Sequence, residues 1–193
     1  MAHRSPRADA LRNRTRILEA ASDAFAQDGA GVPLDTIAAL AGVGPGTVHR
    51  HFPSKQSLVA AVVAARLDRL AEHAGQLHGD PAADFFEFLT ELAAEARHNL
   101  VLTSALGGTL GTEGDIAAER LSNALESLLR AAQRSGAVRP DLTVGELHAI
   151  ITGALTIEQR LPDHRQGLGL EIVLDGLRPR SRPAPALAWL GVC

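Results

Sequence analysis

The sequence is poor in cysteine and in long apolar runs, and each absence excludes a class of protein. Cys193 is the one cysteine among 193 residues, so neither a disulfide framework nor a cysteine metal site can form within one chain. No run of twenty apolar residues could span a bilayer, and the basic N-terminal segment lacks the apolar stretch of a secretory signal. We therefore expect a cytoplasmic protein with no membrane partner, whose 46% apolar content can bury a core in one or two small domains.

Strand patterns are missing too, because no alternating polar and apolar run of strand length is present, and the chain has no internal repeat. Apolar residues recur instead at helical spacing along most of the chain. The pattern predicts helices over about Ala8–Gln27, Leu34–Ala41, Pro45–His51, Ser54–His78, Ala82–Thr103, Asp115–Ser135, Thr143–Arg160 and Gln166–Leu177. The sequence therefore predicts an all-α fold.

The net charge of −3 hides an asymmetry between the two halves of the chain. Residues 1–78 carry nine Lys/Arg against seven Asp/Glu, a balance of +2, whereas residues 79–193 carry ten against fifteen, a balance of −5. The first sixteen residues are the most basic part, with five arginines and one acid. Such a segment is either an arm that lies along phosphates or a solvated tail.

The stretch from Ala41 to Lys55, AGVGPGTVHRHFPSK, combines glycine and proline with several groups able to contact an anion. Two short predicted helices, Leu34–Ala41 and Pro45–His51, are separated by three residues, which is the length of the turn in a helix-turn-helix motif. In this motif the second helix enters the major groove of DNA and reads base edges from its N-terminal part.

Glycine and proline residues in this stretch have predicted places in the motif. Gly42 suits a left-handed backbone conformation, and Pro45 suits the first helical turn, where its missing N–H costs nothing. Gly46 leaves room for a close approach of the backbone to DNA. We expect the small core that holds the three N-terminal helices together to contain Ile37, Val43, Val48, Phe52 and Leu58.

The residues RTRILEAASDAFAQDG and IAALAGVGPGTVHRHFPSKQSLVAAV, spread over about residues 13–63, resemble the DNA-binding domain of the TetR family of bacterial transcriptional regulators. The resemblance implies that Thr47 contacts phosphate or base and that Arg50 occupies the variable, sequence-reading position. His49 stands where the family usually has a tyrosine, so its contact with phosphate would be weaker or pH-dependent. Pro33 stands where the family usually has a capping Ser or Thr, and that contact is expected to be absent. The predicted DNA-binding residues are Arg14, Gly46, Thr47, His49, Arg50, His51 and Lys55.

The second half carries no sharp motif, and the resemblance implies that it binds a small-molecule effector and forms a homodimer through its last two helices. The apolar stripes that such a four-helix interface needs are formed by Leu147, Ile150, Ile151, Ala154, Leu161, Leu170, Val173, Leu174 and Leu177. An aromatic-rich face with a few polar groups is the candidate effector pocket, made of Phe85, Phe86, Phe88, Leu89, Leu92, His98, Asn99, Thr103 and His148. A phenylalanine stripe at helical spacing is more often part of an ordinary hydrophobic core.

The predicted organisation has four parts: an N-terminal arm with a three-helix helix-turn-helix DNA-binding domain over residues 1–53, a connecting helix over 54–78, a helical ligand-binding and dimerisation domain over 79–178, and a proline-rich tail over 179–193. The predicted function is a ligand-responsive regulator, most simply a repressor that binds a palindromic DNA operator as a dimer. No cofactor is expected.

Other interpretations of the same residues fit less well. Gly42, Gly44 and Gly46 follow a helix rather than a strand, which argues against a dinucleotide-binding loop. His49 and His51 point about 200° apart on a helix and cannot share a metal ion. The segment Leu106–Asp115 lacks the Gly-Lys-Ser/Thr ending of a phosphate loop and is predicted to connect two helices.

Two alternative functions stay open. An all-α enzyme could have its site among His98, His148, Glu158 and His164, although these residues have neither metal-binding nor triad spacing. A DNA-binding protein without a ligand would keep the same fold.

Overall fold

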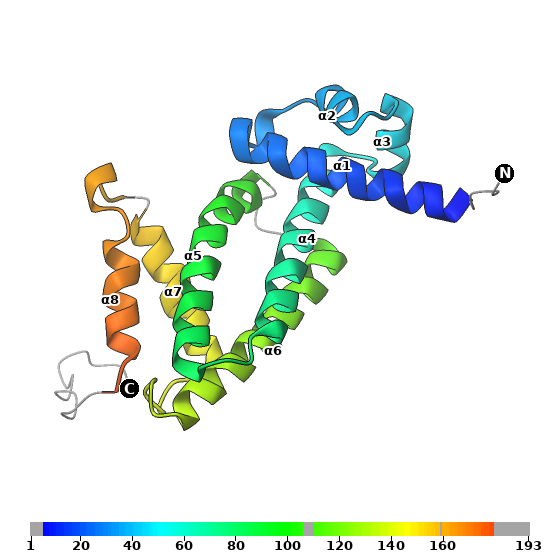
Figure 1. The fold of residues 1–193 in the computed structure, drawn as a ribbon. Helices are drawn as coiled ribbons and strands as arrows, with labels where there is room; N and C mark the ends of the chain where they lie inside the picture. The colour runs from blue at the N-terminus through cyan, green and yellow to red at the C-terminus, as the bar shows by residue number, and fades with distance from the viewer. Residues whose placement is uncertain (1–5, 106–109, 159, 180–193) are drawn as a thin grey trace. The chain divides into compact units, whose positions relative to one another are not determined.

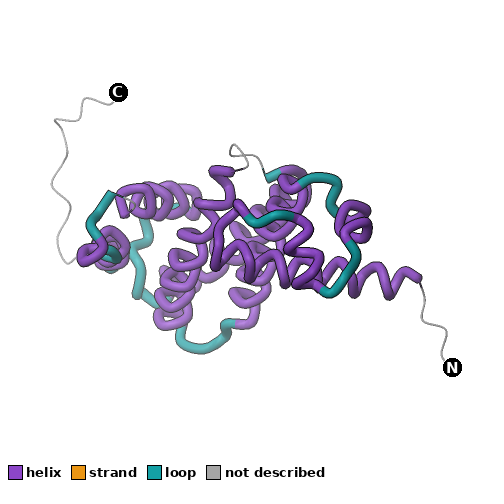
Figure 2. The backbone as a smooth tube through the Cα atoms, turned by 90° about the horizontal axis from the view of Figure 1, so that it is seen from above, coloured by secondary structure: helices purple, strands orange, loops and turns teal. Residues whose placement is uncertain are grey.

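The computed structural model describes residues 6–105, 110–158 and 160–179, without the side chains of residues 6, 97–101, 103–105 and 163. These residues form helices joined by loops, with no strand among them (Figure 2). The helices are α1 (Pro6–Asp28), η1 (Gly29–Gly31), α2 (Leu34–Ala41), α3 (Pro45–His51), α4 (Lys55–Gln76), α5 (Pro81–Ala105), α6 (Gly111–Arg134), α7 (Val144–Glu158), η2 (Asp163–Arg165) and α8 (Leu168–Leu177) (Figure 1). The all-α prediction is confirmed. The proline-rich segment predicted as a tail lies, beyond Pro179, outside the described residues.

The prediction that Leu106–Asp115 merely connects two helices is wrong in its second half. Helix α6 begins at Gly111, whose φ of +69° is one that glycine adopts without strain. Glu113 lies in the first turn of α6, where a carboxylate interacts favourably with the helix dipole. The sequence does not predict this helix start, because glycine and threonine are both frequent in loops.

The described chain packs as two compact units. The first contains the residues up to Leu77 together with Thr90–Leu125, and the second contains His78–Leu89 and the residues from Glu126 onward. Of the three chain boundaries between the units, one lies between α4 and α5, after Leu77, and the other two fall inside the long helices α5 and α6. The predicted domains, in contrast, are continuous stretches of chain. The domain boundary near Gly79 therefore stays a prediction.

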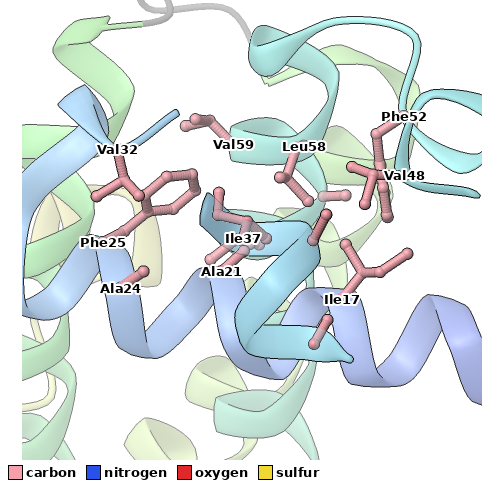
Figure 3. Close-up of a cluster of buried hydrophobic side chains, with 14 of the residues drawn as sticks. Ile17, Ala21, Ala24, Phe25, Val32, Ile37, Val48, Phe52, Leu58 and Val59 are labelled. Atoms are coloured by element: carbon pink, nitrogen blue, oxygen red, sulfur yellow. The ribbon is translucent and has the colours of Figure 1, made fainter. Parts of the chain in front are cut away.

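The first unit is built around an apolar core to which α1, α2, α3 and α4 all contribute (Figure 3). Ile17, Ile37 and Leu58 are completely buried in this core, and Phe52 is 2% exposed. Burying a side chain of this size contributes about 1.5–3 kcal/mol, so these residues fix the three N-terminal helices against α4. Val43 packs against the same cluster, and the predicted small core is confirmed.

The second unit includes α7 packed against α8, and a buried carboxylate joins these two helices. Glu158, the last residue of α7, is 5% exposed. Its Oε2 accepts a hydrogen bond from the N–H of Gly167 at 2.5 Å, and its Oε1 accepts one from Gly169 at 2.5 Å and a longer one from Leu170 at 3.4 Å. Glu158 thus satisfies backbone N–H groups at the N-terminus of α8 and complements the dipole of that helix.

Candidate nucleic-acid interface

The turn between α2 and α3 is fixed by its backbone. Gly42 has φ +61° and ψ +40°, which is the left-handed conformation, and its N–H bonds the carbonyl of Ala39 at 3.1 Å. The N–H of Val43 bonds the carbonyl of Ala38 at 3.0 Å, so the last carbonyls of α2 are satisfied. The left-handed conformation predicted for Gly42 is confirmed.

The start of each short helix also follows the sequence. Pro33 precedes α2 without any side-chain capping bond, as expected from the missing Ser or Thr. Pro45 is the first residue of α3, where proline needs no hydrogen-bond partner for its nitrogen. Together these features place α3 directly after a tight, glycine-defined turn.

One face of helix α3 is buried in the core, and the opposite face is exposed to solvent. Val48 is completely buried in the core, and Phe52 follows the last turn. Among the predicted DNA-binding residues, Gly46, His49 and Arg50 are exposed, and Thr47, His51 and Lys55 are half-buried. The outward face of α3 therefore carries the residue types that contact phosphates and base edges.

Arg50 lies along α3 toward the N-terminal end of that helix. Its Nε donates to the carbonyl of Gly46 at 3.0 Å, and its Nη2 donates to Oγ1 of Thr47 at 3.4 Å. These bonds bring the guanidinium close to the part of a recognition helix that reads bases.

Lys55 begins α4 beside α3. Ser54 caps α4 by a reciprocal pair of hydrogen bonds with Ser57, each 3.1 Å long. Helix α4 begins one residue after the predicted start at Ser54 and ends at Gln76 rather than at His78. The cap fixes the position of Lys55 relative to the end of α3.

Arg14 of α1 is the remaining predicted DNA-binding residue. Its guanidinium carbon lies 5.6 Å from the centre of the Phe52 ring, within the range of a cation–π contact. Its Nη2 also lies 3.0 Å from Oε2 of Glu113 in α6. The basic N-terminal segment, from Pro6 onward, is part of α1. Nothing in the local sequence indicated the pairing with Glu113, because the two residues are 99 positions apart.

A buried polar contact ties this unit together. Arg66 of α4 is 6% exposed, and its Nη2 donates to both the carbonyl oxygen and Oγ of Ser22 in α1, each at 3.1 Å. Its Nη1 lies 3.4 Å from a carboxylate oxygen of Glu95 in α5. The sequence pattern does not indicate that Arg66 is buried, because an arginine in an amphipathic helix is normally solvated.

The residues of the predicted effector pocket are located only in part. Phe85, Phe88 and Leu89 are buried, and Phe86 is half-buried beneath the guanidinium of Arg178, 4.7 Å from its ring centre. Leu92 is half-buried and His148 is exposed. The side chains of His98, Asn99 and Thr103 lie outside the described residues, and the pocket stays a prediction.

The stripes predicted for the dimer interface divide into inward and outward residues. Leu147, Ile151, Ala154 and Leu177 are buried within the chain itself, whereas Ile150 is 42% exposed. Ile172, which the prediction did not include, is 62% exposed. Leu161, Leu170, Val173 and Leu174 are half-buried. An apolar hollow of about 390 Å³ lies on α7 and α8, lined by Ile150, Gly153, Ala154, Ile157, Leu161, Leu168, Gly169, Ile172 and Val173.

Two further observations concern other classes of site. Within residues 6–105, 110–158 and 160–179, no three His, Cys, Asp or Glu side chains are grouped so that they could hold a metal ion. No helix in that part of the chain is long and apolar enough to cross a bilayer.

A glycine turn, a short helix locked by Val48 and Phe52, and an outward face with His49 and Arg50 define a helix-turn-helix regulator. Comparison with known proteins agrees. The profile of bacterial regulatory proteins of the tetR family matches residues 17–62, and that of the C-terminal domain of SbtR-like transcriptional regulators matches residues 80–179. The chain belongs to the TetR family of transcriptional regulators.

Individual relatives point the same way. A TetR regulatory protein from Mycobacterium vanbaalenii is 39% identical, with a TM-score of 0.70 over 91% of this chain and 100% of that one. The TetR regulator SCO0520 from Streptomyces coelicolor is 28% identical, with a TM-score of 0.66 over 87% and 99% of the two chains. An HTH-type transcriptional regulator of Staphylococcus aureus is 37% identical over 75 residues, which is 38% of this chain and 40% of that relative.

Proposed function

We propose that this TetR-family regulator is a ligand-responsive repressor that binds a palindromic operator as a homodimer and is released by a small hydrophobic effector. The observation that carries the proposal is the orientation of α3. Its buried Val48 fixes the helix, and its exposed Arg50 is held near the helix N-terminus by Gly46 and Thr47.

The apolar hollow on α7 and α8 supports dimer formation. Ile150, Ile157 and Ile172 are each at least 42% exposed and line that hollow. Two-fold pairing of this surface with the same surface of a second copy would cover large apolar side chains that are otherwise in water. In the dimer, the two recognition helices would lie about 34 Å apart, or one turn of DNA.

The effector is proposed to be apolar because the predicted pocket residues on the first part of α5 are phenylalanine and leucine. A structural relative, 26% identical with a TM-score of 0.60 over 89% of this chain and 94% of that one, comes from work on the control of antibiotic production by a bacterial hormone. That description belongs to the relative, and it favours a small organic effector here by similarity alone.

Two variants test the assigned DNA contacts. Arg50→Ala should cost about 1–3 kcal/mol on the operator and relax base preference, because a bidentate arginine–guanine pair is lost. Lys55→Ala should weaken binding to operator and random duplex about equally, since a phosphate contact carries no sequence information. Equal losses for Arg50→Ala on both duplexes would contradict the base-reading role.

Calorimetry tests the effector. A ligand that releases the protein from DNA with a coupling of about 1–3 kcal/mol must bind the DNA-bound form roughly 5–150-fold more weakly than the free form. A compound library screened by operator release supplies the candidates. Equal affinity for the two forms would favour the ligand-independent DNA-binding alternative.

A further inference from the structure

Arg14, a predicted DNA-binding residue, makes two contacts within the protein through its guanidinium. One is the cation–π contact with Phe52, which immediately follows the recognition helix α3. The other is the ion pair with Glu113, with an N–O distance of 3.0 Å. A carboxylate and a phosphate both bind the N–H groups of an arginine, so the Glu113 carboxylate pairs with a group that a phosphate could otherwise bind.

The position of Glu113 is fixed by the helix that carries it. Glu113 and Arg120 are seven residues apart on α6 and therefore lie on one face of that helix. Nη1 of Arg120 lies 3.0 Å from Oδ1 of Asp68 in α4, so this face of α6 is directed toward α4. The two ion pairs border a hollow of about 470 Å³ over Ala61, Ala64 and Ala65 of α4.

The pair between Arg14 and Glu113 is also weak enough to exchange. The side chain of Arg14 is 36% exposed and that of Glu113 is 71% exposed. Exposed ion pairs contribute little to stability and are screened by salt, so an incoming phosphate can displace the carboxylate.

Building on the proposed DNA-binding function, we propose that Glu113 lowers the affinity of the protein for DNA. Its carboxylate competes with the DNA phosphates for the guanidinium of Arg14. Binding of DNA to the wild-type protein requires the carboxylate to be replaced by phosphate at Arg14. The contact lowers affinity for every sequence alike, because phosphates carry no sequence information.

The test measures binding of the full chain to a random-sequence duplex over a range of salt concentrations. Glu113→Gln should bind roughly two- to fivefold more tightly than wild type, the range expected from an exposed ion pair. The plot of log affinity against log salt should become somewhat steeper, because in wild type salt also weakens the Arg14–Glu113 pair that DNA must displace. Glu119→Gln, an equal change of charge at an exposed position on the same helix, is the matched control and should leave both quantities close to wild type.

A double-mutant cycle separates this contact from general electrostatics. Arg14→Ala should bind more weakly than wild type, and Arg14→Ala/Glu113→Gln should bind no more tightly than Arg14→Ala. A gain from Glu113→Gln that persists without Arg14, or that equals the gain from Glu119→Gln, would overturn the proposal while leaving the DNA-binding function intact. Wild-type protein that binds no duplex at any salt concentration would overturn the DNA-binding function itself, and this inference with it.

Discussion

Arg66 of α4 donates from one nitrogen, Nη2, to both the carbonyl oxygen and Oγ of Ser22 in α1, each at 3.1 Å. Glu95 of α5 provides the nearby negative charge, 3.4 Å from Nη1. The helix that follows the recognition helix is therefore joined to α1 and to α5 by one buried cation. A buried charge of this kind is strongly unfavourable once its partners are removed.

Arg66→Met and Glu95→Gln test this contact. Glu95→Gln should destabilise the protein because it leaves Arg66 buried without its acid, and a loss of about 3–5 kcal/mol is the upper range for a broken buried pair. Arg66→Met replaces the cation with an apolar side chain. The double variant Arg66→Met/Glu95→Gln should lose less stability than Arg66→Met alone. Chemical denaturation measures both variants, with Arg69→Met, an exposed arginine on α4, as the control. Equal stability of Glu95→Gln and wild type would contradict the role of the pair.

Gly42→Ala should destabilise the helix-turn-helix unit by about 1–2 kcal/mol, the cost of a left-handed conformation for a residue with a Cβ. Its φ is +61°, and an added Cβ would also approach Nη2 of Arg16 to 2.6 Å. Gly75→Ala is the control, because Gly75 lies inside α4 with no atom within 4 Å of the added carbon. Alanine there should stabilise the helix by up to about 1 kcal/mol. Thermal unfolding that shows the same shift for both variants would argue against the turn geometry.

The same residues show why part of the fold can be predicted from sequence. Gly42 and Pro45 have local backbone requirements, so α2 and α3 are predicted to the residue. The ends of α4, α7 and α8 are less predictable, since a helix end depends on which groups satisfy its last N–H and C=O groups.

Contacts between distant segments leave no local signal. Ser22 and Arg66 are 44 positions apart, and Arg14 and Glu113 are 99 positions apart. Periodicity predicts which face of a helix is apolar, and it does not indicate which buried or half-buried charges meet. Glu158 illustrates this limit, because its backbone partners are brought to it by the packing of α8 on α7.

Gly169→Ala should destabilise the second unit. A Cβ at this position would lie 2.8 Å from Oε1 of Glu158, and that carboxylate is buried and held by backbone N–H groups. Overpacking of this kind typically costs about 1–3 kcal/mol. Gly176→Ala on the same helix, where the added carbon meets no atom within 4 Å, is the matched control. Denaturation midpoints should separate the two variants, and a tolerated alanine at position 169 would count against the capping role of Glu158.

Glu146 should make the free energy of unfolding depend on pH in the acidic range. Its carboxylate accepts hydrogen bonds from the backbone N–H and from Oγ1 of Thr143, each at 2.8 Å, and these bonds lower the pKa of Glu146. A carboxyl whose pKa is lowered by folding contributes its full stabilisation above its ordinary pKa of about 4.3. The contribution is lost as the pH falls through the lowered pKa of the folded state.

The stability difference between wild type and Glu146→Gln should therefore shrink on acidification below about pH 4.3, the ordinary pKa of glutamate. Glu119→Gln, which removes an acid on the exposed face of α6, serves as the control. If the stability difference stays constant across this range, the hydrogen bonds from Thr143 do not depend on the charge of Glu146.

Selection of bound duplexes from a random-sequence DNA pool tests the central claim most directly. Two recognition helices related by a two-fold axis and about one DNA turn apart should enrich inverted repeats, with half-site centres separated by about 34 Å or a little more. Arg50→Ala should still recover DNA but with weaker base preference at one position of each half-site. Enrichment of single, unrepeated sites, or no enrichment with the wild-type protein at low salt, would contradict a dimeric regulator that reads DNA through α3.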